Sequence, residues 1–340
     1  MSGSKKILVT GGAGYIGAHT AVELTNAGYE VVVIDNLMNS DLTLINGIEK
    51  ITGSKVNFHR GDCRDKKFLI DLFRTEEPIA AVMHFAALKS VGESVQKPLA
   101  YYENNIGSLI AVLQVMREQG VKDFIFSSSC TVYGQPDSIP VDEQAPFKKA
   151  ESPYGLTKQI CEQILEDVHK TGFRIISLRY FNPIGAHPSA HLGELPIGIP
   201  NNLVPFITQT AAGWRDKLIV FGNDYNTPDG SCIRDFIHVV DLAEAHVKAL
   251  AYLHSVKAST LYEVFNVGTG TGVSVLQLVN AFINKTGAKL PFRIGPRRPG
   301  DVEKVYANPE KIKRAMNWKA RYSPEDALVH AWAWQQKLSR

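Results

Sequence analysis

A tyrosine and a lysine stand four positions apart in the segment Tyr154-Gly155-Leu156-Thr157-Lys158. On an α-helix, positions i and i+4 share a face with Cβ atoms roughly 5–6 Å apart, so the phenol and the ammonium can act together. A free phenol has a pKa of about 10, and lowering it by about three units, roughly 4 kcal/mol, would make a base near neutral pH. An ammonium about 5 Å away supplies roughly 3 kcal/mol at an effective dielectric near 20, and a second positive charge would complete the shift. Such a pair can remove a proton from a bound alcohol.

A run of hydroxyl side chains precedes this pair. The apolar segment Phe124-Ile125-Phe126 leads into Ser127-Ser128-Ser129-Cys130-Thr131. At the carboxyl end of a parallel strand, Ser129 or Thr131 could hydrogen-bond the reacting hydroxyl and align it with Tyr154. The alternative is a turn in which these hydroxyls only cap backbone groups.

A glycine-rich loop follows the first apolar run, with Gly11, Gly14 and Gly17 in a G-x-x-G-x-x-G spacing. Glycine permits a tight turn and close approach of a pyrophosphate, which the N-terminus of the next helix can bind. The alternative is a purely structural turn. Asp35 stands 21 positions after Gly14, where a carboxylate can accept hydrogen bonds from a ribose. The sequence therefore predicts a dinucleotide site.

The choice between NAD and NADP depends on charge. The Asp35 carboxylate would repel a ribose 2′-phosphate, and the following segment Asn36-Leu37-Met38-Asn39-Ser40 has no arginine to neutralise one. NAD is therefore favoured. Asp62, beside Cys63, is placed to bond the adenine edge or, alternatively, to act as a helix N-cap.

Alternating patterns along the first half of the chain position these residues. Buried parallel strands are expected in six apolar runs: 7–9, 31–34, 56–58, 81–85, 124–126 and 175–178,. Helices are expected near 15–27, 98–119 and 153–170. The alternation predicts a Rossmann-type doubly wound parallel sheet, an α/β fold. Residues 183–235 look like loops that shape a pocket, and helical patterns return near 240–253, 274–285 and 323–338,.

Two lobes are therefore expected. One is an NAD-binding domain over residues 1–182, to which segments near 236–265 return, and the other is a smaller mixed α/β lobe over 183–340.

Composition is that of a globular enzyme, with 44% hydrophobic and 21% charged residues, and the net charge of +3 is too small for a nucleic-acid groove,. No membrane or secretion segment is expected, so we predict a cytoplasmic location with Cys63, Cys130, Cys161 and Cys232 reduced,.

Longer motifs carry a resemblance that runs nearly end to end. Taken together, the motifs resemble the extended short-chain dehydrogenase/reductase superfamily and, within it, the UDP-glucose 4-epimerases. The motifs are the segments 10–17, 35–37, 84–89 with 91–94, 127–129, 179–183, 200–203, 221–225, 234–238 and 296–301.

The resemblance implies a redox-neutral reaction at the sugar 4-position through a 4-keto intermediate, with NAD bound throughout and a UDP-sugar as substrate. The nucleotide would be held tightly and the hexose loosely, so that the keto sugar can turn over. Catalysis would fall to Tyr154, Lys158, Ser129 and Thr131. Three of these residues, Ser129, Tyr154 and Lys158, would also contact the cofactor. The other implied cofactor residues are Gly11, Gly14, Tyr15, Ile16, Gly17, Asp35, Asn36, Asn39, Ser40, Asp62, Cys63, Phe85, Ala86, Lys89, Asn104 and Tyr180.

The resemblance also implies a UDP-sugar site. Two arginines from separate loops can fork onto a diphosphate, an aromatic ring can flank uracil and a carboxylate can accept from ribose hydroxyls; the alternative for the arginines is a surface salt bridge. The implied substrate residues are Asn182, Asn202, Leu203, Phe221, Arg234, Arg298, Asp301 and Val305.

Three departures from the motifs common in the family are Gly107-Ser108, Cys130 and Val305. The first two are expected to tune packing near the cofactor. Val305 stands where strict glucose/galactose epimerases resemble one another in having a tyrosine. We hypothesise that this smaller residue leaves room for an acetamido group, so that UDP-GlcNAc and UDP-GalNAc are also accepted.

Two other functions compete. A nucleotide-sugar 4,6-dehydratase would use the same Tyr/Lys oxidation but also needs an acid and a base to eliminate water. Dehydratases resemble one another in having a Thr-Asp-Glu type sequence at this point, whereas Ser129-Cys130-Thr131 has no carboxylate. A non-catalytic NAD-sensing protein would not need the Tyr/Lys pair and two arginines at once. No metal site is expected, because His187 and His191 flank Pro188 in a loop,. By similarity, a homodimer is expected, with the apolar helix near 98–119 as a candidate face.

Overall fold

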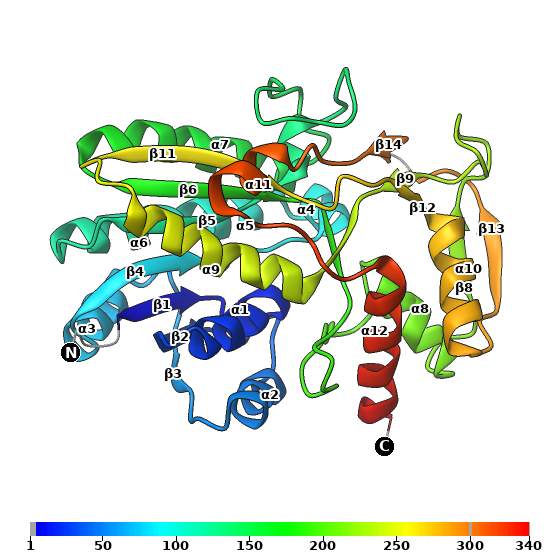
Figure 1. Ribbon diagram of the computed structural model, residues 1–340, viewed down its shortest axis with the longest axis horizontal. Helices are drawn as coiled ribbons and strands as arrows, with labels where there is room; N and C mark the ends of the chain where they lie inside the picture. The colour runs from blue at the N-terminus through cyan, green and yellow to red at the C-terminus, as the bar shows by residue number, and fades with distance from the viewer. Residues whose placement is uncertain (1–4, 299–300, 340) are drawn as a thin grey trace. The chain divides into compact units, whose positions relative to one another are not determined.

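The computed structural model describes residues 5–298 and 301–339. Within these residues the chain divides into two compact units. Unit 1 comprises Met1–Gly134, Pro146–Arg179 and Ala243–Phe265, and unit 2 comprises Gln135–Ala145, Tyr180–Leu242 and Asn266–Arg340. Each unit is built from several separate segments, so the path of the chain passes between them more than once (Figure 1).

A seven-stranded sheet forms the centre of unit 1, in the order β11-β6-β5-β4-β1-β2-β3. The pairings from β5 through β4, β1 and β2 to β3 are all parallel. Its central strands are buried on both faces, which explains their unbroken apolar runs,. The Rossmann-type α/β prediction is confirmed. The strands are β1 (Lys6–Thr10), β2 (Glu30–Asp35), β3 (Asn57–Arg60), β4 (Ile79–His84), β5 (Asp123–Ser129), β6 (Arg174–Tyr180) and β11 (Leu261–Val267).

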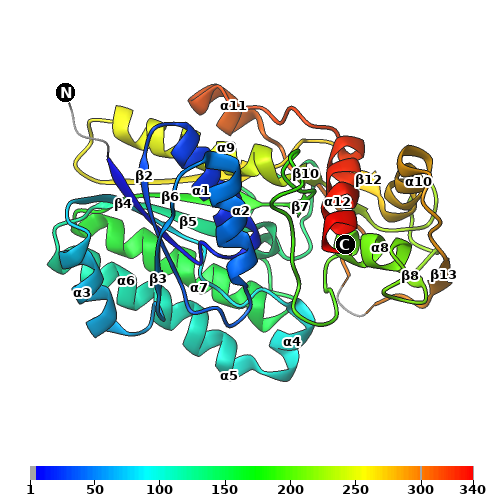
Figure 2. The ribbon, with the colours of Figure 1, turned by 90° about the horizontal axis from the view of Figure 1, so that it is seen from below.

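Helices cover both faces of this sheet. Figure 2 shows α3, α6 and α7 along one face and α1 and α9 along the other. Leu72, Val112 and Leu165, from the first three of these helices, join strand residues in one apolar core. The helices are α1 (Tyr15–Asn26), α2 (Leu42–Thr52), α3 (Lys66–Thr75), α4 (Val91–Gln96), α5 (Pro98–Tyr101), α6 (Gly107–Glu118), α7 (Pro153–Val168) and α9 (Val239–Ser255).

The helix predictions for unit 1 were partly right. The patterns near 15–27 and 153–170 are confirmed as α1 and α7, the latter continued by a 3₁₀ turn, His169–Thr171. The expected helix 98–119 is α5 and α6 joined by a π-helical turn, Tyr102–Ile106. Helices α2 and α3 were missed, although Asp41 and Asp65 cap their N-termini by accepting bonds from Thr43 N and Phe68 N,.

Unit 2 packs α8, α10 and α12 around an apolar core beside small sheets. The expectation that 183–235 is mainly loop is wrong at Leu203–Ala211, where a short apolar helix buries Val204 and Ile207. The three helical patterns expected after residue 236 are confirmed as α9, α10 and α12. The elements are β7 (Asn182–Ile184), α8 (Leu203–Ala211), β8 (Leu218–Phe221), β9 (Ile233–Arg234), β10 (Phe236–His238), β12 (Val273–Ser274), α10 (Val275–Thr286), β13 (Phe292–Gly295), β14 (Lys304–Val305), α11 (Glu310–Met316) and α12 (Pro324–Leu338).

The four cysteines form no disulfide. Three of them are buried, and Cys130 is half-buried. Each of them is therefore at least partly packed inside the protein. Across 5–298 and 301–339, none of the helices is both long enough and apolar enough to cross a membrane.

Candidate active site

The glycine loop connects β1 to α1 in unit 1. Gly11 has φ +67°, and a Cβ there would lie 2.6 Å from the main-chain nitrogen of Ala86, so only glycine fits,. Gly14 is the N-cap residue of α1 and has no side chain to cover the helix end. A Cβ at Gly14 would meet only the Gly11 oxygen, at 3.1 Å, so space remains in front of the helix N-terminus. This space and the positive end of the helix dipole suit a pyrophosphate.

Asp35 ends β2 beside this loop and is 8% exposed. Its carboxylate accepts hydrogen bonds from Ala13 N at 3.1 Å, Leu37 N at 2.9 Å and Ser40 Oγ at 2.7 Å. A carboxylate offers about four acceptor positions, so the bonds that fix its orientation leave capacity for a ribose hydroxyl. The Asp35 carboxylate is therefore suited to bind the ribose of a dinucleotide.

Asp62 lies close to the same strand ends. It accepts from Asn36 Nδ2 at 3.2 Å and from Arg64 Nη2 at 2.8 Å, and these bonds lower the pKa of the Asp62 carboxyl to about 2. The alternative that Asp62 caps a helix is wrong, since Asp65 is the N-cap of α3. Asp62 is thus held ionised near Asn36, and a ligand would bind it by taking the place of one of these hydrogen bonds,.

The remaining cofactor candidates lie on several elements, most of them in unit 1. Phe85 N donates to Thr10 O at 3.0 Å, and the Lys89 ammonium lies 5.9 Å from the centre of the Tyr15 ring. Ile16 is the second residue of α1, and Cys63 is buried after β3. Asn39 is exposed, and Asn104 lies in the π-helical turn and donates to Asn105. Tyr180 is buried at the end of β6 and belongs to unit 2.

The tyrosine and lysine lie together on α7, which begins with Ser152 as N-cap and Pro153 in the first turn,. The Lys158 ammonium is 6.0 Å from the centre of the Tyr154 ring. Lys158 Nζ donates to Ser127 O at 2.6 Å, and Ser129 hydrogen-bonds the Tyr154 phenol. Helix α7 and the end of β5 thus bring base, ammonium and hydroxyl together.

Burial opposes ionisation of both groups. It raises the pKa of Tyr154 to about 12 and lowers the pKa of Lys158 to about 8, while the hydrogen bond from Ser129 works against the first shift. At neutral pH, Lys158 is therefore mostly an ammonium and Tyr154 a neutral phenol. The ammonium by itself does not make the phenol a base, which agrees with the need for a second positive charge derived above.

Thr131 has a buried hydroxyl without a partner. Within the described ranges, its Oγ1 atom is buried and forms no hydrogen bond. Its main-chain N–H is bonded to Ser129 Oγ at 3.2 Å, so Ser129 does cap backbone while it also contacts Tyr154. An unsatisfied buried hydroxyl costs free energy and calls for an explanation, and a bound alcohol would provide a partner.

The arginine candidates meet in unit 2. Asp301 contacts Arg298 Nη2 at 2.7 Å and Arg234 Nη2 at 3.6 Å, and the Arg298 guanidinium lies 5.9 Å from the centre of the Phe221 ring. Val305 on β14 pairs with Arg234 on β9. The salt bridges considered as the alternative are thus present, but they also bring three candidate residues, Arg234, Arg298 and Asp301, together. Pro299 and Gly300 of the same motif lie outside the described residues.

The other substrate candidates are held separately. Asn202 Nδ2 donates to Glu194 Oε1 at 2.6 Å, Leu203 begins α8, and Asn182 N donates to Asp235 O at 2.9 Å. None of these bonds reaches either arginine. His187 and His191, considered as metal ligands, contact Ser189 Oγ at 2.8 Å and Lys337 Nζ at 2.7 Å.

Sequence reasoning missed several residues that support the reacting groups. His84 contacts Thr10 Oγ1 at 2.8 Å, and burial lowers its pKa to about 3, so it is a neutral imidazole near Lys158. Glu162 and Arg179 form a buried ion pair behind α7. The one available signal for Glu162 was its i+4 spacing from Lys158, and Arg179 stood in the motif 179–183 without a role.

Comparisons with known proteins agree with this geometry. The family model described as GDP-mannose 4,6 dehydratase matches residues 8–330. A UDP-glucose 4-epimerase of Bacillus subtilis is 50% identical over 331 residues, covering 97% of this chain and 96% of its own length. The structure is similar to that of a UDP-glucose 4-epimerase from Stenotrophomonas maltophila with bound NAD and formylated UDP-arabinopyranose (TM-score 0.95, 47% identity, 98% and 99% coverage). It is also similar to the Bifidobacterium longum enzyme in complex with NAD+ and UDP (TM-score 0.94, 45% identity, 98% of both chains).

Proposed function

Because the chain belongs to the extended short-chain dehydrogenase/reductase family and, within it, to the UDP-glucose 4-epimerases, we propose that it interconverts UDP-glucose and UDP-galactose with NAD as resident cofactor. The enzyme is an isomerase, and the reaction is redox-neutral at the sugar 4-position. The observation that carries the proposal is the meeting of Tyr154, Lys158 and Ser129 next to the unpartnered hydroxyl of Thr131.

The NAD site would be formed by the glycine loop and the ends of β2 and β3. Gly14 leaves the N-terminus of α1 open to the pyrophosphate, and Asp35 is oriented to accept from the adenosine ribose,. Bound NAD⁺ supplies a hydride acceptor and the second positive charge that the ionisation of Tyr154 requires.

The chain's own residues would manage the proton. Tyr154 removes the proton from the sugar 4-hydroxyl while Ser129 and Thr131 hold that oxygen in line. Loss of the C4 hydrogen as hydride leaves a 4-keto sugar, and Tyr154 returns the proton to the oxygen when hydride comes back on the other face. Lys158 stabilises the phenolate through its ammonium, which the Ser127 carbonyl holds in place.

We place the UDP-sugar with the residues gathered around Asp301 in unit 2. Arg234 and Arg298 carry the charge that a diphosphate requires, and each would exchange part of its contact with Asp301 for a phosphate,. Phe221 is 41% exposed beside Arg298 and can flank uracil. Asn182, Asn202 and Leu203 complete the proposed set. In this assignment residues 1–182, with segments near 236–265, form the NAD-binding domain and 183–340 mainly the UDP-sugar lobe.

The dehydratase alternative has less support. The family model carries a dehydratase description, but the relatives of about half identity are epimerases. A dehydratase needs an acid and a base to remove water, and the turn after β5 presents Cys130 and Thr131 without a carboxylate,. A protein that only senses NAD would gain nothing from the pair of Tyr154 with the buried Lys158, whose charge is costly to bury,.

The smaller side chain of Val305 extends the proposed substrate range. Val305 is buried on β14 and pairs with Arg234 on β9. By the resemblance described above, strict glucose/galactose epimerases have a tyrosine at this position. We propose that UDP-GlcNAc and UDP-GalNAc are also interconverted. Their acetamido group would use the room that a tyrosine would fill.

We also propose a cytoplasmic homodimer. The four cysteines form no disulfide with one another, which suits a reducing compartment,. Val95 on α4 and Leu99 on α5 are 63% and 81% exposed, and Leu156 on α7, a helix that both α4 and α5 contact, is 37% exposed. Such neighbouring apolar side chains on unit 1 are suited to a partner subunit.

Conversion of UDP-galactose to UDP-glucose by the purified protein tests the proposed function. The Tyr154→Phe variant should lose about 10²–10⁴-fold in kcat, because it removes the group that takes the proton. Tyr29→Phe, at a remote half-buried tyrosine, is the matched control and should retain full activity. Absorbance and mass analysis of the same preparations should detect bound NAD in both. Full activity of Tyr154→Phe would place the active site elsewhere.

A further inference from the structure

Helix α7 contacts the end of β5 at a third point beyond Tyr154 and Lys158. Glu162 follows Lys158 by four positions, so the three side chains lie on one face of the helix,. Ser128 Oγ donates to Glu162 Oε1 at 2.5 Å. The residues on either side of Ser128 bind Lys158 and Tyr154, so three successive strand residues fix three successive turns of the helix.

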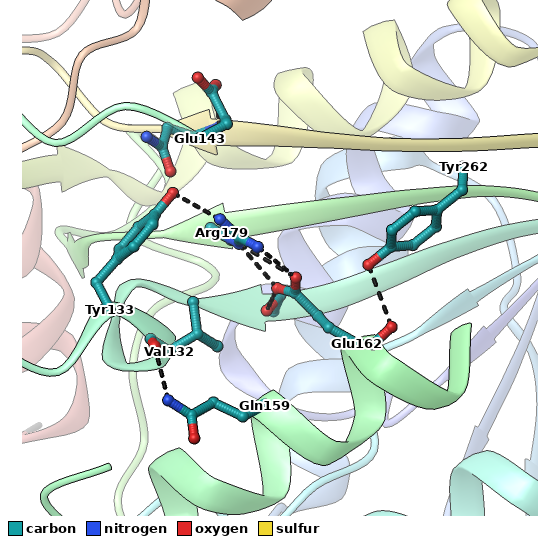
Figure 3. Close-up of polar contacts among 9 residues, drawn as sticks. Val132, Tyr133, Glu143, Gln159, Glu162, Arg179 and Tyr262 are labelled. Carbon is teal, nitrogen blue, oxygen red and sulfur yellow. Dashed lines mark hydrogen bonds and ion pairs between the residues drawn. The ribbon is translucent and has the colours of Figure 1, made fainter. Parts of the chain in front are cut away.

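Arg179 holds Glu162 from the neighbouring strand β6. Its Nη2 atom lies 2.6 Å from Glu162 Oε2, and its Nε atom lies 3.0 Å from Oε1 and 3.2 Å from Oε2. Figure 3 shows this paired contact, with the Tyr262 hydroxyl bonded to the Glu162 main-chain oxygen at 3.2 Å. Both carboxylate oxygens are thereby engaged, and the carboxylate has one fixed orientation.

The same guanidinium reaches the turn that follows Ser129. Arg179 Nη1 donates to the Tyr133 hydroxyl at 2.9 Å, and the guanidinium carbon lies 4.8 Å from the centre of the Tyr133 ring (Figure 3). Tyr133 ends the 3₁₀ turn Cys130–Tyr133, which carries Thr131. Gln159 Nε2 on α7 donates to Val132 O of that turn at 2.8 Å. One ion pair therefore ties the helix, the strand and the hydroxyl-bearing turn together.

This pair is almost completely buried, since Glu162 is 1% and Arg179 is 5% exposed. Burying two charges costs desolvation, and an apolar pair of similar size is often equally stable or more stable. The geometric role of the pair explains its place better than stability does. We propose that Glu162, clamped by Arg179 and Ser128, is a positioning residue that fixes α7 against β5 so that Tyr154, Lys158 and the turn hydroxyls face one substrate oxygen. This inference rests on the proposed epimerase function.

The negative charge of Glu162 also raises the pKa of Lys158. The other titratable groups near this lysine are Tyr154 and Cys161 on α7 and His84 at the end of β4. Burial keeps the first two protonated and His84 neutral, because it raises the pKa of Tyr154 and of Cys161 to about 12 and lowers that of His84 to about 3. Glu162 is therefore the anion that favours the Lys158 ammonium, and the positive charge of Arg179 should oppose this effect.

This arrangement makes opposite predictions for the two partners. The pKa of Lys158 can be read from carbon NMR of lysine-labelled protein, with Lys158→Met identifying the resonance. Glu162→Gln should lower this pKa by about one unit, because a facing anion is lost and Arg179 is left uncompensated, whereas Arg179→Met should raise it. Glu166→Gln, one exposed turn further along α7, is the matched control and should change nothing. Shifts of the same sign in both variants, or none, would overturn the proposal.

The double variant Glu162→Leu with Arg179→Met separates positioning from stability. It removes both buried charges together, so its melting temperature should stay near or above that of the wild type. Its kcat for UDP-galactose should still fall about tenfold or more with KM changed less than about twofold, since a displacement of about 1 Å can cost up to about 100-fold in rate. Recovery of wild-type kcat in this double variant would overturn the positioning role. A wild-type protein without epimerase activity would instead refute the proposed function, which the NMR measurement does not depend on.

Discussion

Lys158 Nζ donates a 2.6 Å hydrogen bond to the main-chain oxygen of Ser127. This bond holds a buried ammonium at the end of β5, 4.8 Å from the centre of the Phe126 ring. The lysine is 4% exposed, so its charge has lost most of its hydration. The protein therefore maintains an unfavourable charge at the point where Tyr154 needs one.

Lys158→Met should make the protein more stable and inactive. The pKa of Lys158 is about 8 in the folded protein and 10.5 ordinarily, so the unfolded chain binds this proton more tightly,. The resulting penalty on folding is present in full below about pH 8 and disappears as the pH rises toward 10.5. Removing the charge should raise the free energy of unfolding at pH 7 by up to roughly 3 kcal/mol, less the lost hydrogen bond.

Denaturant unfolding at pH 7 and at pH 10 measures this effect. The gain of Lys158→Met over the wild type should be larger at the lower pH. Lys122→Met, at an exposed lysine before β5, should give the same stability as the wild type at both values. An equal difference at the two pH values would show that Lys158 charge is not the cause.

Gly11→Ala should destabilise unit 1 and abolish NAD retention. The new Cβ would clash with Ala86 N in addition to the strain of a left-handed backbone,. Gly28→Ala is a matched control, because Gly28 has φ +84° and a methyl group there would have no atom within 4 Å. We expect Gly28→Ala to lose about 1 kcal/mol and Gly11→Ala about 1–3 kcal/mol more. Thermal unfolding and bound-NAD analysis measure both, and equal losses would contradict the clash.

Val305→Tyr should remove activity on UDP-GlcNAc while sparing UDP-galactose. The larger ring would fill the space proposed for the acetamido group, next to Arg234. Steady-state assays with both substrate pairs give the ratio of kcat/KM, which should change by about tenfold or more. Val305→Leu, a smaller increase in size, should retain both activities. A wild-type enzyme that does not turn over UDP-GlcNAc would end this idea.

Leu99→Glu should weaken the proposed homodimer. A charge at a position that is 81% exposed costs the subunit itself little, but it would be desolvated in an apolar interface,. Light scattering coupled to size-exclusion chromatography should show monomers at concentrations where the wild type is dimeric. Leu42→Glu, at a 48% exposed leucine on α2, should stay dimeric. Unchanged mass in both variants would place the interface elsewhere.

Part of the secondary structure could be predicted from local sequence patterns, and part could not. Most of the six predicted strands were recognisable because strands buried on both faces are largely apolar, as in Val31-Val32-Val33-Ile34,. The seventh, β11, mixes polar and apolar residues and was not assigned. Helices α2 and α3 were missed although each carries helical signals in the sequence. Each has an apolar stripe, Leu44, Ile45 and Ile48 or Leu69, Leu72 and Phe73, and a capping aspartate, Asp41 or Asp65,.

The sequence alone determined that Tyr154 and Lys158 share a helix face and that Gly11, Gly14 and Gly17 can form a turn before a helix, since both follow from spacing along one segment. The tertiary structure decided the rest. Burial sets the directions of the Tyr154 and Lys158 pKa shifts, and the bond from Arg179 to Glu162 joins a strand to a helix. These depend on segments distant in the chain, because desolvation and ion pairing arise only where packing excludes water.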